Sequence, residues 1–383
     1  MKIKALIVGG SSGLGLAFAH KLLSPAYDCE RLYVLDRVEP QIADERIVFV
    51  RHNLLADEME VFDRFKDINT LIITAGFGRV APFDELLDIE IVNSFKVNTL
   101  ATVRIIKHFY ERMRSADDFY TLVMGSVSGM MSSPLFAVYG ATKAAVDMFA
   151  ESVNTELELL PTANRILNVA PGSLKGTSFN GGKTSLETLS ELTDTLLERL
   201  FKRETLYIPQ YEEVYKNVLH KYRTDPHQSS VDSYNYKLAS GRINHRPQVK
   251  IGYLSGTFDL FHIGHLNLLR RAKDYCDYLV VGVHESGARK GKETFIPFEE
   301  RLDIVRSVRY VDRVMKSYLE DADAWQEVQY DYLFVGSDYK GSERFARYEE
   351  FFRDKDVKII YFPYTQGTSS TQIRRAIEGG AKN

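Results

Sequence analysis

The sequence predicts an α/β protein with two doubly wound parallel-sheet domains in tandem. Short apolar segments alternate with amphipathic segments along the chain, as in parallel strands joined by helices. The alternation stops in a polar stretch rich in Asp, Ser, Asn and Tyr and then restarts. With 383 residues, the chain is long enough for two cores. We expect a first domain over residues 1–223, an irregular linker over 224–248 and a second domain over 249–383.

The expected strands are short apolar runs between turn residues. In the first domain they are Lys2–Val8, Arg31–Leu35, Ile47–Val50, Thr70–Thr74, Tyr120–Met124 and Arg165–Ala170. Helices are expected between these strands and over residues 185–222. In the second domain the expected strands are Val249–Leu254, Tyr278–Val283, Tyr332–Val335 and Lys358–Phe362, with a helix from about Gly264.

Composition excludes several classes of protein. The net charge is −3 and no basic block occurs, which argues against a nucleic-acid partner. The only two cysteines, Cys29 and Cys276, lie in different halves, so a disulfide framework is not expected. We therefore expect the protein in the reducing cytoplasm. The first apolar run ends directly in a glycine loop, unlike a signal peptide, and no run approaches the roughly 18 residues needed to span a membrane.

The first expected strand ends in the loop Gly9-Gly10-Ser11-Ser12-Gly13-Leu14-Gly15, before an expected helix. Glycines permit a tight turn and let the backbone approach a pyrophosphate at the helix N-terminus. The second strand ends in Asp36-Arg37, where an acidic residue would meet the adenosine ribose. The pattern predicts a Rossmann-like dinucleotide site, although an ordinary tight turn has the same glycines.

Tyr139 and Lys143 lie four residues apart in an apolar helical run and therefore share one face. A tyrosine hydroxyl titrates near 10 and is a poor base at neutral pH, but a neighbouring ammonium lowers its pKa. Ser126 lies 13 residues upstream at an expected strand end. Its hydroxyl can hydrogen-bond a substrate carbonyl oxygen that becomes an alkoxide during hydride transfer.

Together with Asn98 and Pro171-Gly172, these residues resemble the classical short-chain dehydrogenase/reductase family in order and spacing. The resemblance implies that Tyr139 donates the proton, Lys143 lowers its pKa, Ser126 orients the carbonyl and Asn98 supports a water relay. The implied cofactor-binding residues are Gly9, Ser11, Ser12, Gly13, Leu14, Gly15, Asp36, Arg37, Ala75, Gly76, Asn98, Tyr139, Lys143, Pro171 and Gly172.

Two loop positions depart from that family. Val8 replaces the usual Thr, and Ile73-Thr74-Ala75-Gly76 replaces Asn-Asn-Ala-Gly; both changes concern loop support. The choice of nicotinamide cofactor stays open. Asp36 would repel a 2′-phosphate and favours NAD(H), whereas the adjacent Arg37 would accept NADP(H).

In the second half, an expected strand leads into a loop that contains His262-Ile263-Gly264-His265. Two histidines at a helix N-terminus can stabilise the charge that spreads over phosphoryl oxygens in a transition state. The alternative interpretation is one histidine as a helix cap and one as a buried neutral residue.

This loop resembles the HxGH nucleotidyltransferases, and the neighbouring motifs resemble glycerol-3-phosphate cytidylyltransferase and its relatives. Nearly all of residues 250–377 is covered. The resemblance implies that His262, His265 and Lys292 are catalytic and that Trp325 lines the nucleotide or phosphate site. The implied nucleotide- or phosphate-binding residues are Gly256, Thr257, Phe258, Asp259, His262, His265, Lys290, Lys292, Arg301, Arg309, Asp338, Thr368, Ser369, Ser370 and Arg374.

The C-terminal motif departs from that family because Tyr364 stands where an arginine is usual. The following Ser369-Ser370-Thr371-Gln372-Ile373-Arg374 resembles the SSTxxR of adenylyltransferases, and Arg374 is expected to supply the missing charge. The acceptor and the base, cytosine or adenine, therefore stay open. Mg²⁺ is expected with the nucleotide, but no carboxylate cluster identifies its ligands.

The fusion suggests one pathway. The chain resembles bifunctional bacterial enzymes that reduce a ketose phosphate, ribulose or xylulose 5-phosphate, with NAD(P)H and couple the polyol phosphate to CTP, giving CDP-ribitol or CDP-xylitol. Alternatives are CDP-glycerol from a triose phosphate, an adenylyltransferase with an attached reductase, or a module that only senses dinucleotide. Lys175, Lys183 and Arg203 are candidate phosphate ligands, each otherwise a solvated cation. Analogy predicts a homodimer or homotetramer.

Overall fold

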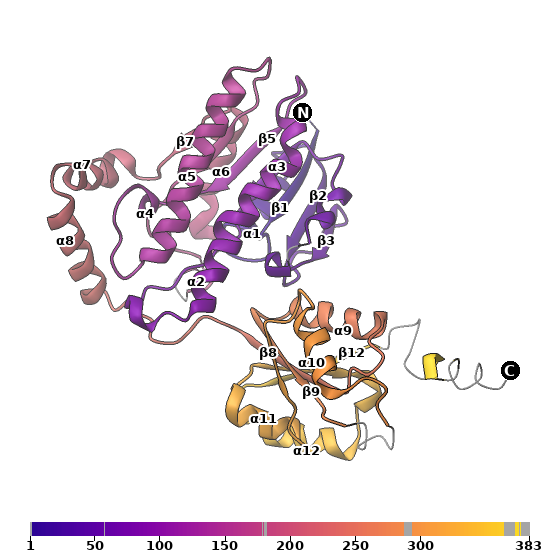
Figure 1. Cartoon of the computed structure of the whole chain (residues 1–383). Coiled ribbons are helices and arrows are strands. Elements are labelled where there is room, and N and C mark those ends of the chain that lie inside the picture. Colours follow the sequence, from indigo (N-terminus) through magenta and orange to yellow (C-terminus); the bar gives the residue numbers. More distant parts are fainter. Residues whose placement is uncertain are drawn as a thin grey trace. The chain divides into compact units, whose positions relative to one another are not determined.

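The structure is a computed structural model that describes residues 2–56, 58–177, 179, 182–286, 293–363, 372–374 and 376 (Figure 1). The chain divides into two compact units, Met1–Gln248 and Val249–Asn383. Each unit contains a parallel sheet with helices packed against it, which confirms the predicted α/β class. Among the described residues, no helix has the length and apolar character needed to cross a bilayer.

The sheet of the first unit has seven parallel strands in the order β3-β2-β1-β4-β5-β6-β7. They are β1 (Ile3–Val8), β2 (Cys29–Asp36), β3 (Ile47–Arg51), β4 (Thr70–Ile73), β5 (Tyr120–Met124), β6 (Ile166–Val169) and β7 (Leu206–Tyr207). The central strands are continuous apolar runs because both of their faces are buried. The two-residue β7 was not predicted, since it is too short to show a pattern.

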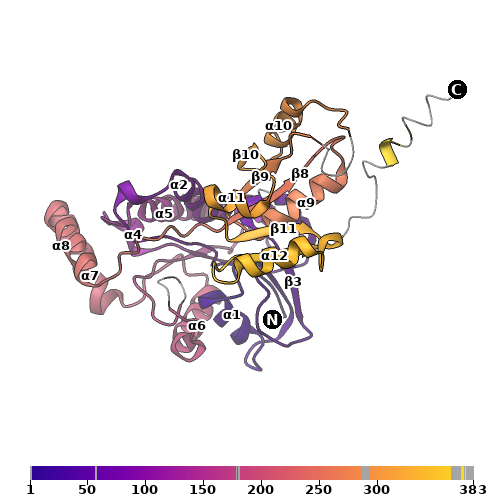
Figure 2. The same cartoon turned by 90° about the horizontal axis from the view of Figure 1, so that it is seen from below.

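Helices cover both faces of this sheet (Figure 2). Helices α1 (Gly13–Leu22) and α6 (Leu186–Phe201) pack on one face. Helices α3 (Thr102–Met113) and α5 (Ala137–Glu158) pack on the other. The smaller helices are α2 (Asp88–Ser94), α4 (Val127–Met130) and α7 (Lys216–Thr224), and the chain forms π-helical turns at Phe95–Ala101 and Tyr211–Tyr215.

The prediction of an irregular linker over residues 224–248 is wrong for most of its length. Helix α8 (Pro226–Ala239) occupies it and belongs to the first unit. Asp225 caps this helix by accepting a hydrogen bond from the Gln228 amide at 2.9 Å, and Pro226 follows at the first helical position. Few apolar residues recur in this helix at helical spacing, so its sequence pattern is typical of a loop. The residues that signal a helix N-terminus, Asp225 and Pro226, were nevertheless present.

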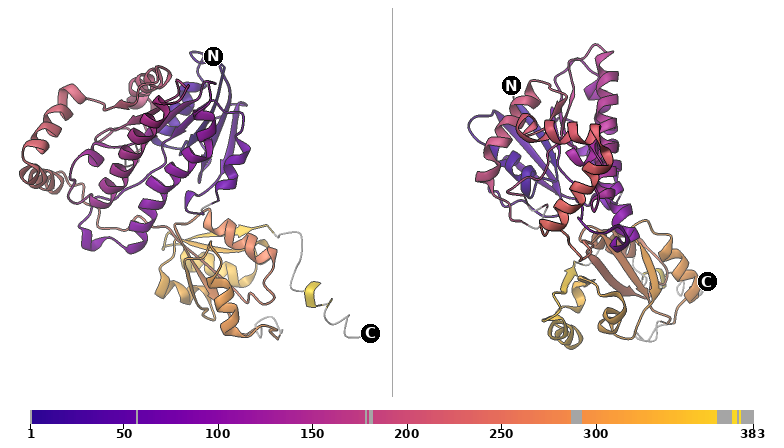
Figure 3. Two further views of the ribbon diagram at one scale, coloured as in Figure 1. Left: turned by 45° about the horizontal axis from the view of Figure 1, so that its top comes forward. Right: turned by 90° about the vertical axis from the view of Figure 1, so that its left-hand side faces the viewer.

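The second unit, coloured orange to yellow in Figure 3, has a sheet of parallel strands. Its five strands have the order β10-β9-β8-β11-β12. They are β8 (Ile251–Gly256), β9 (Tyr278–Val283), β10 (Arg313–Lys316), β11 (Tyr332–Gly336) and β12 (Lys358–Phe362). The edge strand β10 was not predicted, because both of its ends are charged and exposed. The helices are α9 (Ile263–Lys273), α10 (Phe298–Arg306), α11 (Asp321–Val328) and α12 (Glu343–Phe352).

Alternate residues of β8 show that this second sheet is also covered on both faces. Tyr253 packs with α11 and α12 in one core cluster. Gly252 points to the other face, where Cys276, just after α9, lies so close that a Cβ atom on residue 252 would be 2.8 Å from its sulfur. In both units, the strand order reverses beside the first strand, which places the crevice for a ligand at the carboxyl ends of β1 and β8.

Two candidate active sites

The glycine loop after β1 has the close backbone packing that a dinucleotide site requires. Gly9 has φ of +90°, and a Cβ atom there would lie 2.6 Å from the Ala75 amide nitrogen. A Cβ atom on Gly15 would lie 2.1 Å from the Gly9 carbonyl oxygen. The amide of Gly13, at the start of α1, donates to the Thr184 hydroxyl at 2.8 Å. These residues fit a nicotinamide cofactor, whose pyrophosphate would approach the bare backbone at this helix start.

Asp36 is fixed at the end of β2 beside this loop. Its carboxylate accepts hydrogen bonds from the Ser11 amide at 2.9 Å and from the Arg37 amide at 2.6 Å. The position suits a carboxylate that binds ribose hydroxyls. A 2′-phosphate at the same place would meet a negative charge.

The structure brings Ser126, Tyr139 and Lys143 together at the carboxyl end of β5. Ser126 caps α4 by accepting from the Ser128 amide at 3.2 Å, its hydroxyl donates to the Pro171 carbonyl oxygen at 3.3 Å, and it lies near enough to the Tyr139 phenol to affect its pKa. The Lys143 ammonium lies 5.5 Å from the Tyr139 ring centroid and donates to the Met124 carbonyl oxygen at 2.7 Å. The two side chains share one face of α5, as the four-residue spacing predicts.

Burial dominates the protonation of this group. It raises the pKa of Tyr139, with the hydrogen bond from Ser126 opposing the shift. It lowers the pKa of Lys143 to about 8, with the charge of Asp147 opposing. The expected lowering of the tyrosine pKa is therefore not present in this arrangement, because Lys143 hydrogen-bonds a backbone carbonyl and not the phenol. A protonated phenol is the form that donates a proton during reduction.

Asn98 is buried in the π-helical turn Phe95–Ala101. Its amide group donates to the Phe77 carbonyl oxygen at 2.8 Å and to the Thr142 hydroxyl at 3.0 Å, and it accepts from the Phe77 amide at 3.0 Å. The side chain thus joins the loop before residue 78 to α5. A water relay through Asn98 stays a prediction.

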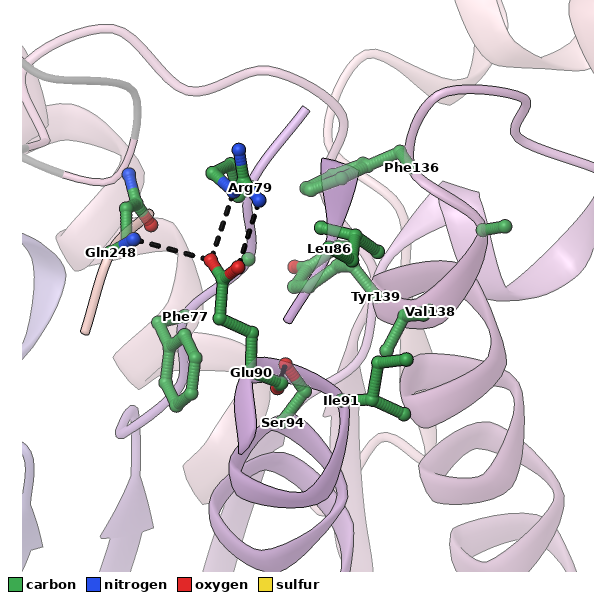
Figure 4. Close-up of a pocket in the computed structure, with 12 residues that line it drawn as sticks. Phe77, Arg79, Leu86, Glu90, Ile91, Ser94, Phe136, Val138, Tyr139 and Gln248 are labelled. Atoms are coloured by element: carbon green, nitrogen blue, oxygen red, sulfur yellow. Dashed lines mark hydrogen bonds and ion pairs between the residues drawn. The ribbon is translucent and has the colours of Figure 1, made fainter. Parts of the chain in front are cut away.

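Aromatic rings cover Tyr139, the candidate catalytic tyrosine, and the sequence interpretation missed them. Phe136 stacks on Tyr139 with ring centroids 4.2 Å apart, and Phe179 lies 5.2 Å from the same ring. A Cβ atom on Gly78 would lie 2.5 Å from the Tyr139 ring, so only glycine fits there. Figure 4 shows Phe136 and Tyr139 in the wall of a pocket that also contains the ion pair between Arg79 and Glu90.

Asp147 is a second residue that the sequence interpretation did not select. It lies four residues after Lys143, and its carboxylate accepts a hydrogen bond from the Asn168 amide at 2.9 Å. Burial raises the pKa of Asp147 to about 6, opposed by the Asn168 hydrogen bond and by Lys143. The i, i+4 spacing from the lysine was the available signal.

Of the candidate phosphate ligands of the first unit, Arg203 lies away from this site. Arg203 forms an ion pair with Asp118 and lies over the Tyr120 ring at 4.8 Å. Both partners are at the amino end of β5, opposite to the end that carries Ser126. Lys175 and Lys183 are exposed, as solvated cations would be.

In the second unit, the loop after β8 holds the two predicted histidines against each other. His262 caps α9, and its Nδ1 accepts a hydrogen bond from the Gly264 amide at 3.0 Å. The His262 and His265 rings stack with centroids 4.1 Å apart. Burial lowers the pKa of His262, and because Nδ1 accepts the hydrogen bond from Gly264, the proton of the neutral ring is on Nε2. The cap interpretation is thus correct for His262, and Nε2 is the ring nitrogen that can donate.

The same loop is strained at two non-glycine residues. Phe258 has φ of +53° and Leu260 has φ of +51°, in the left-handed region that side chains rarely adopt. A backbone conformation of this kind persists only where contacts with neighbouring residues hold it in place. It is common in loops whose function requires a fixed conformation.

Arg301 is one such neighbour, which corrects its prediction as a phosphate ligand. Its guanidinium is fully buried and donates to four backbone carbonyl oxygens. They belong to Ile296 at 2.9 Å, Thr257 at 2.5 Å, His284 at 2.7 Å and Glu285 at 2.8 Å. Since these carbonyl oxygens occupy its guanidinium, Arg301 stabilises the loop that contains the histidines. It does not act as a ligand of the nucleotide phosphates.

Asp259 and Arg374 also differ from their predicted roles. The Asp259 carboxylate accepts from the Phe295 and Ile296 amides at 3.1 and 3.0 Å and forms an ion pair with Arg374. The Arg374 guanidinium lies over the Phe295 ring at 4.7 Å. Since its charge is already paired with Asp259, Arg374 does not supply a free cation for the nucleotide.

The remaining predicted residues of this site have varied positions. Trp325 packs against Phe351 and Phe352 and donates to the Tyr330 carbonyl oxygen at 3.2 Å, so it belongs to the core and not to a nucleotide site. Arg309 and Asp338 are exposed. Lys290, Lys292, Thr368, Ser369 and Ser370 lie outside the described residues. Within the part that the structure describes, no three His, Cys, Asp or Glu side chains form a metal site.

Comparisons with known proteins divide the chain at the same place. The family described as short chain dehydrogenase matches residues 4–187, and the family described as cytidylyltransferase-like matches residues 253–376. Over 128 residues the chain is 34% identical to the glycerol-3-phosphate cytidylyltransferase of Staphylococcus aureus, covering 32% of this chain and 92% of that protein.

The first half has its own relatives. An uncharacterised short-chain type dehydrogenase/reductase of Sinorhizobium fredii is 31% identical over 186 residues, covering 45% of this chain and 69% of that protein. The crystal structure of a short chain dehydrogenase/reductase from Burkholderia phymatum in complex with NAD matches 59% of this chain and 96% of its own, with TM-score 0.50 and 16% identity. This likeness concerns the fold.

Proposed function

The chain belongs to two families, the short chain dehydrogenases over residues 4–187 and the cytidylyltransferase-like proteins over residues 253–376, and from this premise we propose a two-step reaction. The chain is a bifunctional enzyme with oxidoreductase and cytidylyltransferase parts. The first part reduces a pentulose 5-phosphate of the ribulose or xylulose type to a polyol phosphate. The second part couples the polyol phosphate to CTP, which gives CDP-ribitol or CDP-xylitol and pyrophosphate.

The observation that carries the proposal is the presence of two separate charge-stabilising groups in one chain. Tyr139 and Ser126 lie together beside a dinucleotide loop, and His262 stacks on His265 at the start of α9. Each group suits the charge that one of the two reactions creates: an alkoxide in the first and phosphoryl oxygens in the second.

In the reduction, the glycine loop after β1 and Asp36 would hold NAD(P)H, which when bound would supply the hydride for the carbonyl carbon. Tyr139 donates its phenolic proton to the carbonyl oxygen, and its raised pKa keeps that proton in place until the oxygen becomes basic. Ser126 holds the same oxygen by its hydroxyl. The Asp36 carboxylate at the end of β2 would repel a 2′-phosphate and would thus favour NADH, whereas the adjacent Arg37 would accept NADPH.

In the transfer, a phosphate oxygen of the polyol phosphate attacks the α-phosphorus of CTP and pyrophosphate leaves. The Nε2–H of His262 and the positive end of the α9 helix dipole stabilise the oxygens in the transition state. Mg²⁺ is expected to accompany CTP and to neutralise its phosphates. No covalent enzyme intermediate is needed.

A second candidate product is CDP-glycerol made from dihydroxyacetone phosphate. It is favoured by the relative from Staphylococcus aureus, whose name gives glycerol 3-phosphate as its substrate. The Asp259–Arg374 pair and the unusual C-terminal motif leave ATP as a rival to CTP.

The test is a pair of assays on the full chain. Oxidation of NADH and NADPH is followed with ribulose 5-phosphate, xylulose 5-phosphate and dihydroxyacetone phosphate, and pyrophosphate release is followed with CTP or ATP and each matching polyol phosphate. The proposal expects a pentulose phosphate and CTP to give the highest kcat/KM. A preference for the triose phosphate supports CDP-glycerol, and a preference for ATP contradicts the cytidylyltransferase assignment.

A further inference from the structure

Lys237 of α8 is a buried cation that the two proposed reactions do not use. Its side chain is in the segment predicted as a linker, and the residue is only 8% exposed. Its ammonium donates to the Ser133 hydroxyl at 3.0 Å and to the Ser233 hydroxyl at 2.8 Å. Among the described residues, no carboxylate forms an ion pair with it.

The surroundings of this ammonium are positive rather than negative. Burial, together with a smaller effect of the nearby charge of Arg242, lowers the pKa of Lys237 to about 8. Arg242 is half-buried, lies over the Tyr236 ring at 5.3 Å and pairs with no carboxylate in the described part of the chain. A buried charge that meets only hydroxyls and a second cation is poorly compensated, and an anion would remove that cost.

A short series of contacts through Ser133 and Phe136 links Lys237 to Tyr139. Ser133 is in the loop between α4 and α5, and Figures 1 and 2 both show α8 beside that loop. The Ser133 carbonyl oxygen accepts from the Phe136 amide at 3.0 Å. Phe136 in turn stacks on Tyr139. An anion held between Ser133 and Lys237 would therefore be on the substrate side of α5.

We propose that Lys237, Arg242 and the hydroxyls of Ser133 and Ser233 bind the phosphate monoester of the ketone that the first unit reduces. The inference rests on the proposed reductase function and assigns its specificity for phosphorylated substrates. A phosphate supplies several strong acceptor oxygens, so it can take charge-assisted hydrogen bonds from the ammonium and the guanidinium while both hydroxyls turn to donate. These residues take the place of Lys175, Lys183 and Arg203, the cations expected from the sequence.

The first experiment separates phosphate recognition from catalysis by comparing each ketose phosphate with the same ketose lacking the phosphate. In Lys237→Met, the KM for the phosphorylated ketone is expected to rise by about 10- to 100-fold, the loss of a hydrogen bond to a charged group. The kcat and the KM for the free ketose are expected to stay near the wild-type values. Lys237→Arg is expected to restore part of the affinity.

The matched control is Lys216→Met, which removes an exposed lysine that pairs with Glu212 in the same region. It should leave both KM values unchanged. If Lys237→Met does not fold, Arg242→Gln keeps the buried lysine and is expected to raise the same KM by a smaller factor. Equal changes for both substrates, or no change in Lys237→Met and Arg242→Gln, would overturn the proposal.

A second measurement does not depend on the reductase. Inorganic phosphate is expected to raise the thermal midpoint of the wild-type full chain more than that of Lys237→Met, while phosphate bound at nucleotide sites adds equally to both. Equal increments contradict the phosphate site. If no ketose phosphate is reduced but the increments differ, the proposed substrate is wrong and the anion site stands.

Discussion

At the scale of single residues, the account depends on a protonated Tyr139 close to Ser126. Tyr139→Phe keeps the ring and its stacking on Phe136 but removes the proton that reduction needs. We expect NAD(P)H oxidation to fall by about 10²- to 10⁴-fold, the usual contribution of a general acid. Pyrophosphate release from CTP and a polyol phosphate in the same preparation serves as the control and should not change. A variant that still reduces the ketone at the wild-type rate would remove Tyr139 from the mechanism.

His262 combines two roles that substitutions can separate. His262→Asn keeps a side chain that can cap α9, whereas His262→Ala removes the cap and should also destabilise the second unit by about 1 kcal/mol. Both lack the imidazole donor, so both should lower pyrophosphate release by about 10²- to 10³-fold. Reductase activity should be retained in both. Full transferase activity in His262→Asn would show that His262 only caps the helix.

The raised pKa of Asp147 makes the stability of the first unit depend on pH, and the stability is expected to fall as pH rises. Its carboxyl titrates at 3.8 when unfolded and at about 6 when folded, because burial raises its pKa. Between these values the folded state binds the extra proton, so the free energy of unfolding falls as pH rises, by up to about 3 kcal/mol. Asp147→Asn should lack this decrease.

The measurement is urea unfolding at several pH values across that window, followed by circular dichroism. The single tryptophan, Trp325, is in the second unit, so its fluorescence is an internal control that Asp147→Asn should leave unchanged. Parallel pH profiles of the wild type and the variant would contradict the role of Asp147.

The sequence predicted the residues whose partners are close along the chain. Tyr139 and Lys143 share a helix, and His262 and His265 share one turn, so spacing alone places them. The roles predicted for Arg301 and Arg374 were wrong because the partners of these residues are distant in the sequence. Arg301 binds carbonyl oxygens from three other segments, and Arg374 pairs with a carboxylate 115 residues away. Lys237 was missed for the same reason, since Ser133 lies 104 residues before it.

At the scale of elements, a buried ion pair joins α2 to the end of the first unit. Arg79 donates to both oxygens of Glu90 at 2.9 and 2.8 Å and to the Asn244 carbonyl oxygen at 2.9 Å (Figure 4). The Gln248 amide donates to the same carboxylate at 3.2 Å. This pair therefore fixes the segment after α8 against the wall of the pocket that contains Tyr139.

Removing only one residue of this ion pair is expected to lower the free energy of unfolding of the first unit. Arg79→Met leaves Glu90 buried without its partner and is expected to destabilise the first unit by about 3–5 kcal/mol. The double variant Arg79→Met/Glu90→Met should recover much of that loss. Urea unfolding by circular dichroism measures both, again with Trp325 fluorescence as the control. A single variant as stable as the double one would show that the pair is not tightly coupled.

Elements with strong apolar periods were predicted, and elements held by tertiary contacts were not. The buried strands β1, β4 and β5 need no partner information because their runs are apolar throughout. Strands β7 and β10 exist because a neighbouring strand pairs with them. Helix α8 is held by its cap and by Lys237 rather than by an apolar face, so only its end signals could have identified it.

At the scale of the whole molecule, the two units repeat one arrangement with different chemistry. In each sheet, the order of the strands reverses beside the first strand. Each of these first strands leads into a loop and a helix N-terminus that suit an anion. The first loop excludes side chains so that a dinucleotide can approach, and the second presents two stacked imidazoles. The same order of strands thus serves hydride transfer in one unit and nucleotidyl transfer in the other.

The most direct test of the two-step reaction follows one hydride from the cofactor into the final nucleotide. The full chain is incubated with CTP, Mg²⁺, a pentulose 5-phosphate and NAD(P)H that carries deuterium on the transferred position, and the products are analysed by mass spectrometry. We expect a CDP-polyol that contains the deuterium, none in Tyr139→Phe, and only unlabelled product when that variant is given the polyol phosphate. A wild-type protein that forms no deuterated CDP-linked product under these conditions would contradict the account.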